Sequence, residues 1–93
     1  MPLFTFIMDY HGGNYISQTQ AATPLAALNR WAKSINTDEV ANFGEQTKAS
    51  LVKATLDKNN PPMPLIGNKN VWCFTPLLRG HVALINFVLT DTR

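Results

Sequence analysis

The chain has 93 residues, enough for one domain spanning residues 1–93 and too few for two separate cores. Hydrophobic residues make up 45% and charged residues 15%, so the chain is apolar enough to fold and is not a disordered segment. The net charge is +2 and the basic residues are scattered singly, which does not favour a nucleic-acid partner or an acidic membrane surface.

A β-hairpin is predicted at the start of the chain. Aromatic and branched residues alternate along residues 3–10, which is the period-two pattern of a strand with two distinct faces. The glycine pair at residues 12–13 predicts a two-residue turn, because both positions tolerate a positive φ, and this turn places Tyr10 opposite Tyr15. The return strand, expected at residues 15–21, is polar, as is typical of an edge strand.

An amphipathic helix is predicted after the hairpin. It begins at Thr23 and Pro24, since the threonine hydroxyl can accept a free amide of the first turn and proline at the first helical position loses no hydrogen bond. The apolar stripe that we expect to face the sheet contains Leu25, Leu28, Trp31, Ala32 and Ile35.

A second helical stretch follows. Thr37 precedes two acidic residues and is predicted to cap a short helical turn, because acids are favourable at the start of a helix. The apolar pattern breaks near Gly44, and a helix is expected from about Glu45 to Leu56. A strand at residues 51–56 is the competing interpretation of its second half.

Two strands are predicted in the last part of the chain, at residues 71–77 and 81–90, where apolar and branched residues dominate. With residues 79–80 as the turn between them, Trp72 lies opposite Phe87. The first of these strands contains a proline, which lacks a ladder donor, so we expect it at an edge of the sheet. The second is apolar on both faces and is expected inside the sheet.

Together these elements predict an α+β fold, a two-layer ββ-αα-ββ sandwich with a four-stranded antiparallel sheet in the order 2-1-4-3. This order keeps the strands of each predicted hairpin next to each other, and it places the helices on one face of the sheet. The face assigned to the helices is the aromatic one, formed by Phe4, Phe6, Met8, Trp72, Phe74, Ile85 and Phe87.

The sequence contains no Gly-x-Gly-x-x-Gly, P-loop, His-Glu-x-x-His, Cys-x-x-Cys or Gly-x-Ser-x-Gly motif. No cofactor is therefore expected, and an enzyme is not favoured. The single cysteine, Cys73, excludes an internal disulfide and a zinc site built from several cysteines. As a nucleophile it would need His81, which the predicted hairpin places opposite Leu78 and about 17 Å away at roughly 3.3 Å per residue. A cysteine inside an apolar strand is more often a small core residue.

Asp9 and His11 share a strand face beside the first turn and could hold a metal ion or act as acid and base. Two such residues do not make a metal site, and nothing in the sequence brings His81, the other histidine, close to them. A solvated hairpin tip is the favoured interpretation. A small enzyme or ligand-binding protein that uses Asp9, His11 or Cys73 is the alternative hypothesis.

A weak single-stranded nucleic-acid binder is a further alternative. Tyr10, His11 and Tyr15 could stack bases, with Arg30 and Lys33 on the nearby helix. The basic groove that such proteins also need is missing from the sequence. A pair of tyrosines facing each other across two strands is an ordinary hairpin stabiliser.

The opening of the chain resembles HicB-like antitoxins. Residues 12–16, the short polar strand that continues them and residues 23–28 are similar to the glycine–tyrosine strand and following helix of that family. The resemblance covers about a third of the chain. The third strand that those domains place before the helix is missing, and the second half of the chain has no counterpart, so no activity or partner is carried over.

The sheet face turned away from the helices is predicted to be an interaction surface. Its apolar side chains are Ile7, Ile16, Val71, Leu77, Val82, Leu84 and Val88. One-sided antiparallel sheets normally turn a polar face to water, and an apolar patch above ~400 Å² usually marks an interaction site. We expect a second copy of the chain, forming a homodimer, or another protein to cover this face. The alternative is that residues 57–70 fold over it, with Met63, Leu65 and Ile66 as a plug.

These observations favour a small non-catalytic domain for protein interaction or self-association. The chain has no basic residue before its first apolar run, and no apolar run approaches the roughly 20 residues that span a bilayer. We therefore expect a cytoplasmic protein with no membrane partner.

Overall fold

The first hairpin follows the alternation of its residues. In the computed structural model, which describes residues 1–92, β1 (Leu3–Tyr10) pairs antiparallel with β2 (Gly13–Gln20). The even-numbered side chains of β1 are buried, and the odd-numbered ones lie on the other side of the strand. β2 has a neighbouring strand on one side only, so its predicted position at the edge is confirmed.

The turn of this hairpin is His11-Gly12 and not the predicted Gly12-Gly13. Both turn residues have a positive φ, 52° at His11 and 77° at Gly12, as a two-residue turn between twisted strands requires. Tyr10 therefore lies opposite Gly13, and the predicted pairing of Tyr10 with Tyr15 is wrong. The Tyr15 ring folds over Gly13, where a Cβ would come within 2.5 Å of the phenol oxygen. The shift is two residues, so every side chain keeps its predicted face.

The helix α1 (Pro24–Ser34) begins as the sequence predicts. The Thr23 hydroxyl accepts the backbone N–H of Ala26 at 3.2 Å, and a proline takes the first helical position. The buried stripe consists of Ala27, Leu28, Trp31 and Ala32. The prediction that Leu25 faces the sheet is wrong. This side chain is 53% exposed, because the first turn of α1 lies beside the end of the next helix, where Leu25 shares a hollow with Leu56.

A short 3-10 helix, η1 (Thr37–Glu39), follows α1. Its cap is Asn36 and not Thr37, because the Asn36 side-chain oxygen accepts the backbone N–H of Asp38 at 3.1 Å. The Thr37 hydroxyl is used elsewhere and donates to the Glu45 carboxylate at 3.2 Å. The predicted helical turn is therefore present, with its cap one residue earlier.

The helix α2 (Glu45–Ala54) begins directly after Gly44, as predicted. The competing interpretation of residues 51–56 as a strand is wrong. The two helices are joined by a hydrogen bond in which the Asn29 side-chain amide donates to the Thr55 hydroxyl at 2.8 Å. This bond links the middle of α1 to the end of α2.

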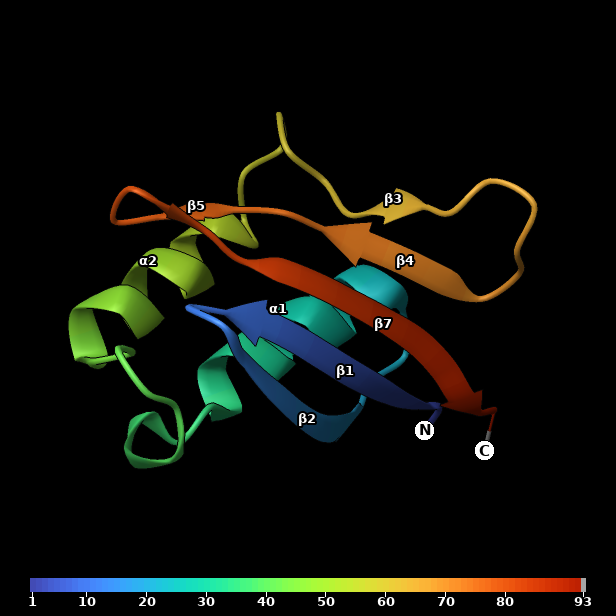
Figure 1. Cartoon of the computed structure of the whole chain (residues 1–93). Helices are drawn as coiled ribbons and strands as arrows, with labels where there is room; N and C mark the ends of the chain where they lie inside the picture. Colours follow the sequence, from blue (N-terminus) through green and yellow to red (C-terminus); the bar gives the residue numbers. More distant parts are fainter. Residues whose placement is uncertain (93) are drawn as a thin grey trace.

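The remaining strands are β3 (Met63–Pro64), β4 (Val71–Phe74), β5 (Leu77–Leu78), β6 (His81–Val82) and β7 (Leu84–Asp91). The main sheet has the order β2-β1-β7-β4-β3, and β5 pairs with β6 in a separate two-stranded ladder (Figure 1). The predicted neighbours are confirmed, since the two hairpins meet through β1 and β7. β7 lies between β1 and β4, as its two apolar faces predict.

The second hairpin has the predicted register. Trp72 lies opposite Phe87, and Leu78 lies opposite His81 beside the turn. Each predicted strand is divided into two, however, because Pro76 lacks the N–H that a continuous ladder needs.

The main sheet has five strands and not the predicted four. Met63 pairs with Cys73 and Pro64 with Trp72, so β3 covers the edge at which the sequence places β4. A two-residue strand shows no alternation, and its proline-rich surroundings predict a loop. The sequence pattern therefore could not reveal β3.

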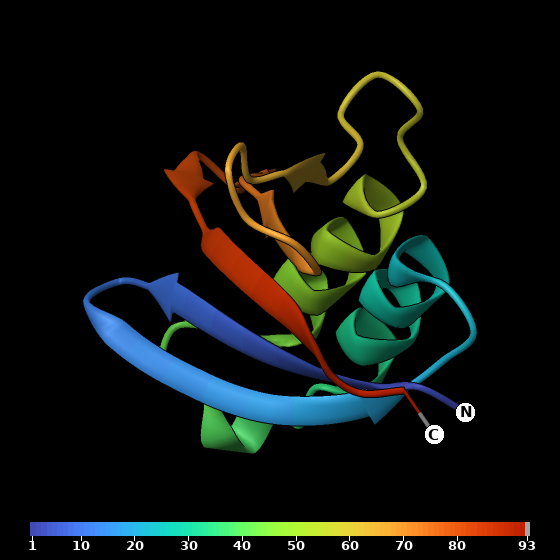
Figure 2. The same ribbon diagram turned by 90° about the vertical axis from the view of Figure 1, so that its right-hand side faces the viewer.

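Both helices pack on the aromatic face of the sheet, and the other face carries no helix (Figure 2). Phe6 is stacked between Trp31 of α1 and Phe87 of β7, with ring centroids 4.7 Å and 4.6 Å away. Trp72 of β4 continues the stack against Phe87 at 5.4 Å. The Trp31 indole N–H donates to the Ser17 hydroxyl of β2 at 2.8 Å. These four rings, the aromatic column, connect the helical layer to three strands.

Phe6→Ala removes an inner ring of the aromatic column. The free energy of unfolding should fall by about 3–5 kcal/mol, because the large neighbouring rings cannot collapse into the cavity. Phe6→Leu keeps part of the volume and should lose less. Urea unfolding followed by tryptophan fluorescence measures both changes.

The matched control is Ile7→Ala, one residue further along β1 on the opposite face. Because Ile7 is 37% exposed, we expect the free energy of unfolding to fall by only about 1 kcal/mol in this variant. Equal losses for the Phe6 and Ile7 variants would contradict the assignment of one buried and one open face to β1.

Candidate functional site

The sheet face without helices, which we call the outer face, is formed by alternate side chains of all five strands of the main sheet and of β5 and β6. It includes Thr5, Ile7, Asp9, Ile16, Gln18, Met63, Val71, Cys73, Leu77, Val82, Leu84, Asn86 and Val88. One row crosses the whole sheet through Ile16, Ile7, Asn86, Cys73 and Met63. The outer face is therefore a continuous surface and not a set of isolated side chains.

The predicted interaction residues are largely open to solvent. The exposed ones are Ile7 (37%), Leu84 (40%), Val82 (63%), Ile16 (68%) and Leu77 (68%). Val71 and Val88 are half-buried. The predicted plug over this face is not formed, because Ile66 is 100% exposed and Met63 joins the β4 edge with its side chain 61% exposed.

The polar side chains at one end of the outer face bond to one another. The Gln18 side-chain amide donates to the Thr5 hydroxyl at 3.1 Å, and the Thr5 hydroxyl also shares a hydrogen bond with that of Thr90. These hydrogen bonds satisfy part of the polar groups within the chain, which lowers the desolvation cost that an approaching surface meets there.

The first turn places His11 against two other rings. Its imidazole centroid lies 4.5 Å from the Tyr10 ring and 4.3 Å from the His81 ring. The prediction that nothing brings His81 close is therefore wrong. β1 and β7 pair with Asp9 opposite Leu84, and the same register continued past the strand ends brings residue 81 beside the turn. The predicted antiparallel pairing of the first and last strands already contained this signal.

The end of the sheet beside the first turn, where Asp9, His11 and His81 lie, does not form a metal site. Asp9 is an exposed residue of β1, whereas His11 leaves the strand with a left-handed backbone. Among residues 1–92, no group of three His, Cys, Asp or Glu side chains lies close enough to hold a metal ion. His11 and His81 offer two ligand groups, one fewer than a catalytic zinc site takes from the protein.

Cys73 is a half-buried member of the outer face, opposite Met63 on one side and Asn86 on the other. Its position is on the surface row, not in the core that the sequence favours. His81 lies opposite Leu78, five residues along the hairpin, which is about 17 Å at roughly 3.3 Å per residue. The structure does not bring the thiol to an imidazole.

The clearest hollows of the described surface lie around the helices and along the β2 edge. One, of about 480 Å³, lies between the start of α1 and the end of α2, where Leu25 and Leu56 line it. Asp9, His11 and Cys73 line none of five well-formed hollows on residues 1–92, which include the one between α1 and α2. These three candidates therefore do not converge on a pocket.

The tyrosines proposed as base-stacking platforms are already engaged. Tyr10 is 2% exposed and packs edge-on against Phe43. The Tyr15 phenol oxygen accepts the backbone N–H of Ala41 at 3.2 Å. A buried ring has no free face for a base, so the structure gives no support to the nucleic-acid alternative.

No family model, no curated protein and no solved structure matches this chain. The resemblance of residues 12–28 to HicB-like antitoxins therefore gains no support from the comparisons. Among the described residues, no helix has the length and apolar character needed to cross a membrane. Function is argued below from the geometry alone.

Gly12→Ala tests the geometry of the tip. The free energy of unfolding should fall by about 1 kcal/mol, because a residue with a side chain is strained in this left-handed conformation. A Cβ at this position meets nothing within 4 Å, so the strain acts without a clash. Urea unfolding measures the loss.

Gly13→Ala is the companion variant and acts by a different route. Its Cβ pushes the Tyr15 ring aside, so the hydrogen bond from the Ala41 amide should break and the NMR signal of that amide should move. Gly12→Ala should leave this signal in place. A neutral Gly12→Ala would contradict the left-handed backbone at Gly12, and an unmoved Ala41 signal in Gly13→Ala would contradict the packing of Tyr15 over Gly13.

Proposed function

We propose that the protein is a small non-catalytic interaction module that docks through its outer face. The observation that carries the proposal is an uncovered face of a five-stranded sheet whose apolar side chains stay exposed from β2 to β6. Apolar area of this kind is costly in water and is usually covered by a partner. The expected compartment is the cytoplasm.

The occupant favoured for this face is a second copy of the chain. The seven apolar residues carry no charge, and the carboxylate of Asp9 lies at the end of the face beside the first turn, so two copies that keep Asp9 at the rim can meet without repulsion between like charges. Sheets pack face to face with their strands within about 30° of each other, and a symmetric pair is the commonest assembly of identical chains. Another protein on the same face is the second candidate.

The small-enzyme alternative is less well supported. It requires a pocket in which two of Asp9, His11 and Cys73 converge. The hollows of the described surface are lined by other residues, and the exposed tip gives a substrate no enclosed site.

Leu84→Lys places a charge in the outer face. At micromolar concentration, sedimentation should show a lighter assembly than wild type, because burying the unpaired ammonium between two copies costs several kcal/mol or more. The variant should stay folded, since the Leu84 side chain is open to solvent in the single chain. Cys73, in the same face, should react faster with a thiol reagent once the face is uncovered.

The matched control is Leu56→Lys, on the helical layer. Leu56 is 67% exposed and lies outside the sheet, so the change should alter neither the mass nor the thiol reactivity. A wild-type chain that sediments as a monomer would contradict self-association. An unfolded Leu84→Lys variant would show that the face is covered within the chain.

A further inference from the structure

The two edges of the main sheet differ sharply. One edge is β3, two residues long and surrounded by prolines at positions 61, 62 and 64. The other edge is β2, eight residues long, with no proline and no charged residue. Short strands, prolines and charges are the usual means of blocking strand addition, so β3 is protected and β2 is open.

The register of the first hairpin tells which backbone groups of β2 are free. In a two-residue hairpin the pair next to the turn, Tyr10 and Gly13, is hydrogen-bonded, and bonded pairs then alternate along the ladder. The N–H of Ala21 donates to the Pro2 carbonyl at 3.1 Å, which continues the odd-numbered series. The residues whose N–H and C=O point away from β1 are therefore Asn14, Ile16, Gln18 and Gln20.

An added strand needs room for its own side chains on the helix side of β2, and two hollows provide it. One, of about 310 Å³, lies between residues 14–17 of β2 and the segment around η1. The other, of about 340 Å³, lies between residues 18–20 of β2 and α1. The space beside β2 is thus open along both halves of the strand.

We propose that β2 pairs antiparallel with β2 of a second copy, so that one sheet continues through both chains. The register places Ile16 opposite Gln18 of the partner subunit and Asn14 opposite Gln20 of the partner subunit. All four outward N–H groups and all four outward C=O groups then have partners. A two-fold axis passes beside Ser17. The contact is made by the backbone edge of β2 and not by the apolar side chains of the outer face, although Ile16 and Gln18 belong to both, so it does not rest on the function proposed above.

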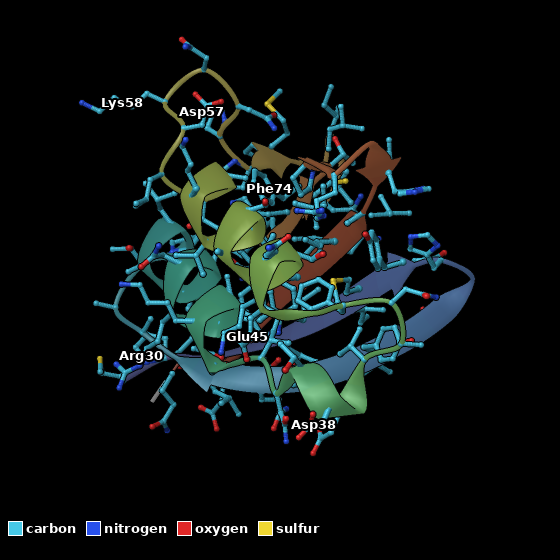
Figure 3. The ribbon with its side chains drawn as sticks, turned by 90° about the vertical axis from the view of Figure 1, so that its left-hand side faces the viewer. Arg30, Asp38, Glu45, Asp57, Lys58 and Phe74 are labelled. Carbon is cyan, nitrogen blue, oxygen red and sulfur yellow. The ribbon has the colours of Figure 1, made fainter. Side chains whose placement is uncertain are left out.

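The charges on the helix side of the edge fit this symmetry. Arg30 lines the hollow at the Gln20 end of the strand, and Glu39 lines the hollow at the Asn14 end. Figure 3 shows Arg30 well separated from Asp38, the acidic neighbour of Glu39, along the lower side of the molecule. Because the axis brings the Gln20 end of one chain to the Asn14 end of the other, Arg30 faces the partner subunit's Glu39. The two-fold axis makes this contact twice.

The decisive variant is Gln18→Pro. It removes an outward N–H, while the bonds between β2 and β1 use the odd-numbered residues and stay intact. In the Leu84→Lys background, which disables the outer face, we expect a dimer by sedimentation and a monomer once Gln18→Pro is added. Gln18→Ala is the control, because it loses the side-chain bond to Thr5 and keeps the N–H, and it should remain a dimer. Circular dichroism and thermal unfolding check that each variant folds.

A charge exchange tests the same contact without introducing a proline, again in the Leu84→Lys background, where the outer face no longer contributes to self-association. Arg30→Glu and Glu39→Arg should each weaken self-association by about tenfold at low salt, since like charges then meet twice across the axis. The double variant should restore most of the affinity. No rescue in the double variant would overturn the proposed symmetry.

Disulfide trapping fixes the register. With Cys73→Ser removing the native thiol, Ser17→Cys places two thiols across the axis in a non-hydrogen-bonded pair, with Cα atoms about 4.5 Å apart and within disulfide range. Mild oxidation should give a covalent dimer. Asn14→Cys is the control and should not crosslink, because residue 14 of each copy lies opposite Gln20 of the partner subunit and not opposite another residue 14.

The outcomes separate the two proposals. If Leu84→Lys alone gives a monomer, the edge contact is overturned and the outer face is the whole interface. If Gln18→Pro and Gln18→Ala give the same mass, strand pairing is overturned. Equal crosslinking of the Ser17 and Asn14 variants would also overturn it. A dimer that survives Leu84→Lys and is lost with Gln18→Pro supports the edge contact whatever the outer face binds.

Discussion

The aromatic column is the interaction on which the rest of the structure depends. Trp31 belongs to α1, Phe6 to β1, Phe87 to β7 and Trp72 to β4, so one stack of rings joins segments far apart in the chain. Burying these rings fixes the face of each strand that the helices cover. Because successive side chains of a strand point to opposite faces, the remaining apolar residues of these strands must lie on the outer face. An apolar outer surface is thus a consequence of how the core is built.

The sequence predicts local geometry well where one arrangement of the turn is available. Arg79-Gly80 lies between Leu78 and His81 and offers a single two-residue turn, and the register of the second hairpin follows from it. At the first turn, His11, Gly12 and Gly13 offer two adjacent choices. The choice depends on the Tyr15 ring folding over Gly13 and on the amide of Ala41, which comes from a distant segment. Local pattern cannot decide a contact of that range.

The residues of the outer face could be predicted from the sequence, whereas the contacts that tertiary packing makes beside them could not. Alternation alone identifies the seven apolar residues of the outer face, since it needs only the period of a strand. The predicted antiparallel pairing of β1 with β7 already brings the first turn near the start of the last strand, but the contact of His11 with His81 also needs the register between these strands, which no turn fixes. The two-residue strand β3 and the exposed position of Leu25 likewise follow from tertiary packing and from the proline-rich segment, which have no periodic signal.

The central position of β7 has a consequence for how the chain folds during synthesis. Residues 84–91 are made last among the described strands, yet they lie between β1 and β4 and supply Phe87 to the core. Until they leave the ribosome, the hairpin and helices expose an aromatic surface with no strand beside β1. Such unpaired edges in a partly made chain are prone to aggregation. The folding step that closes the core is therefore a long-range insertion, and it is expected to be slow.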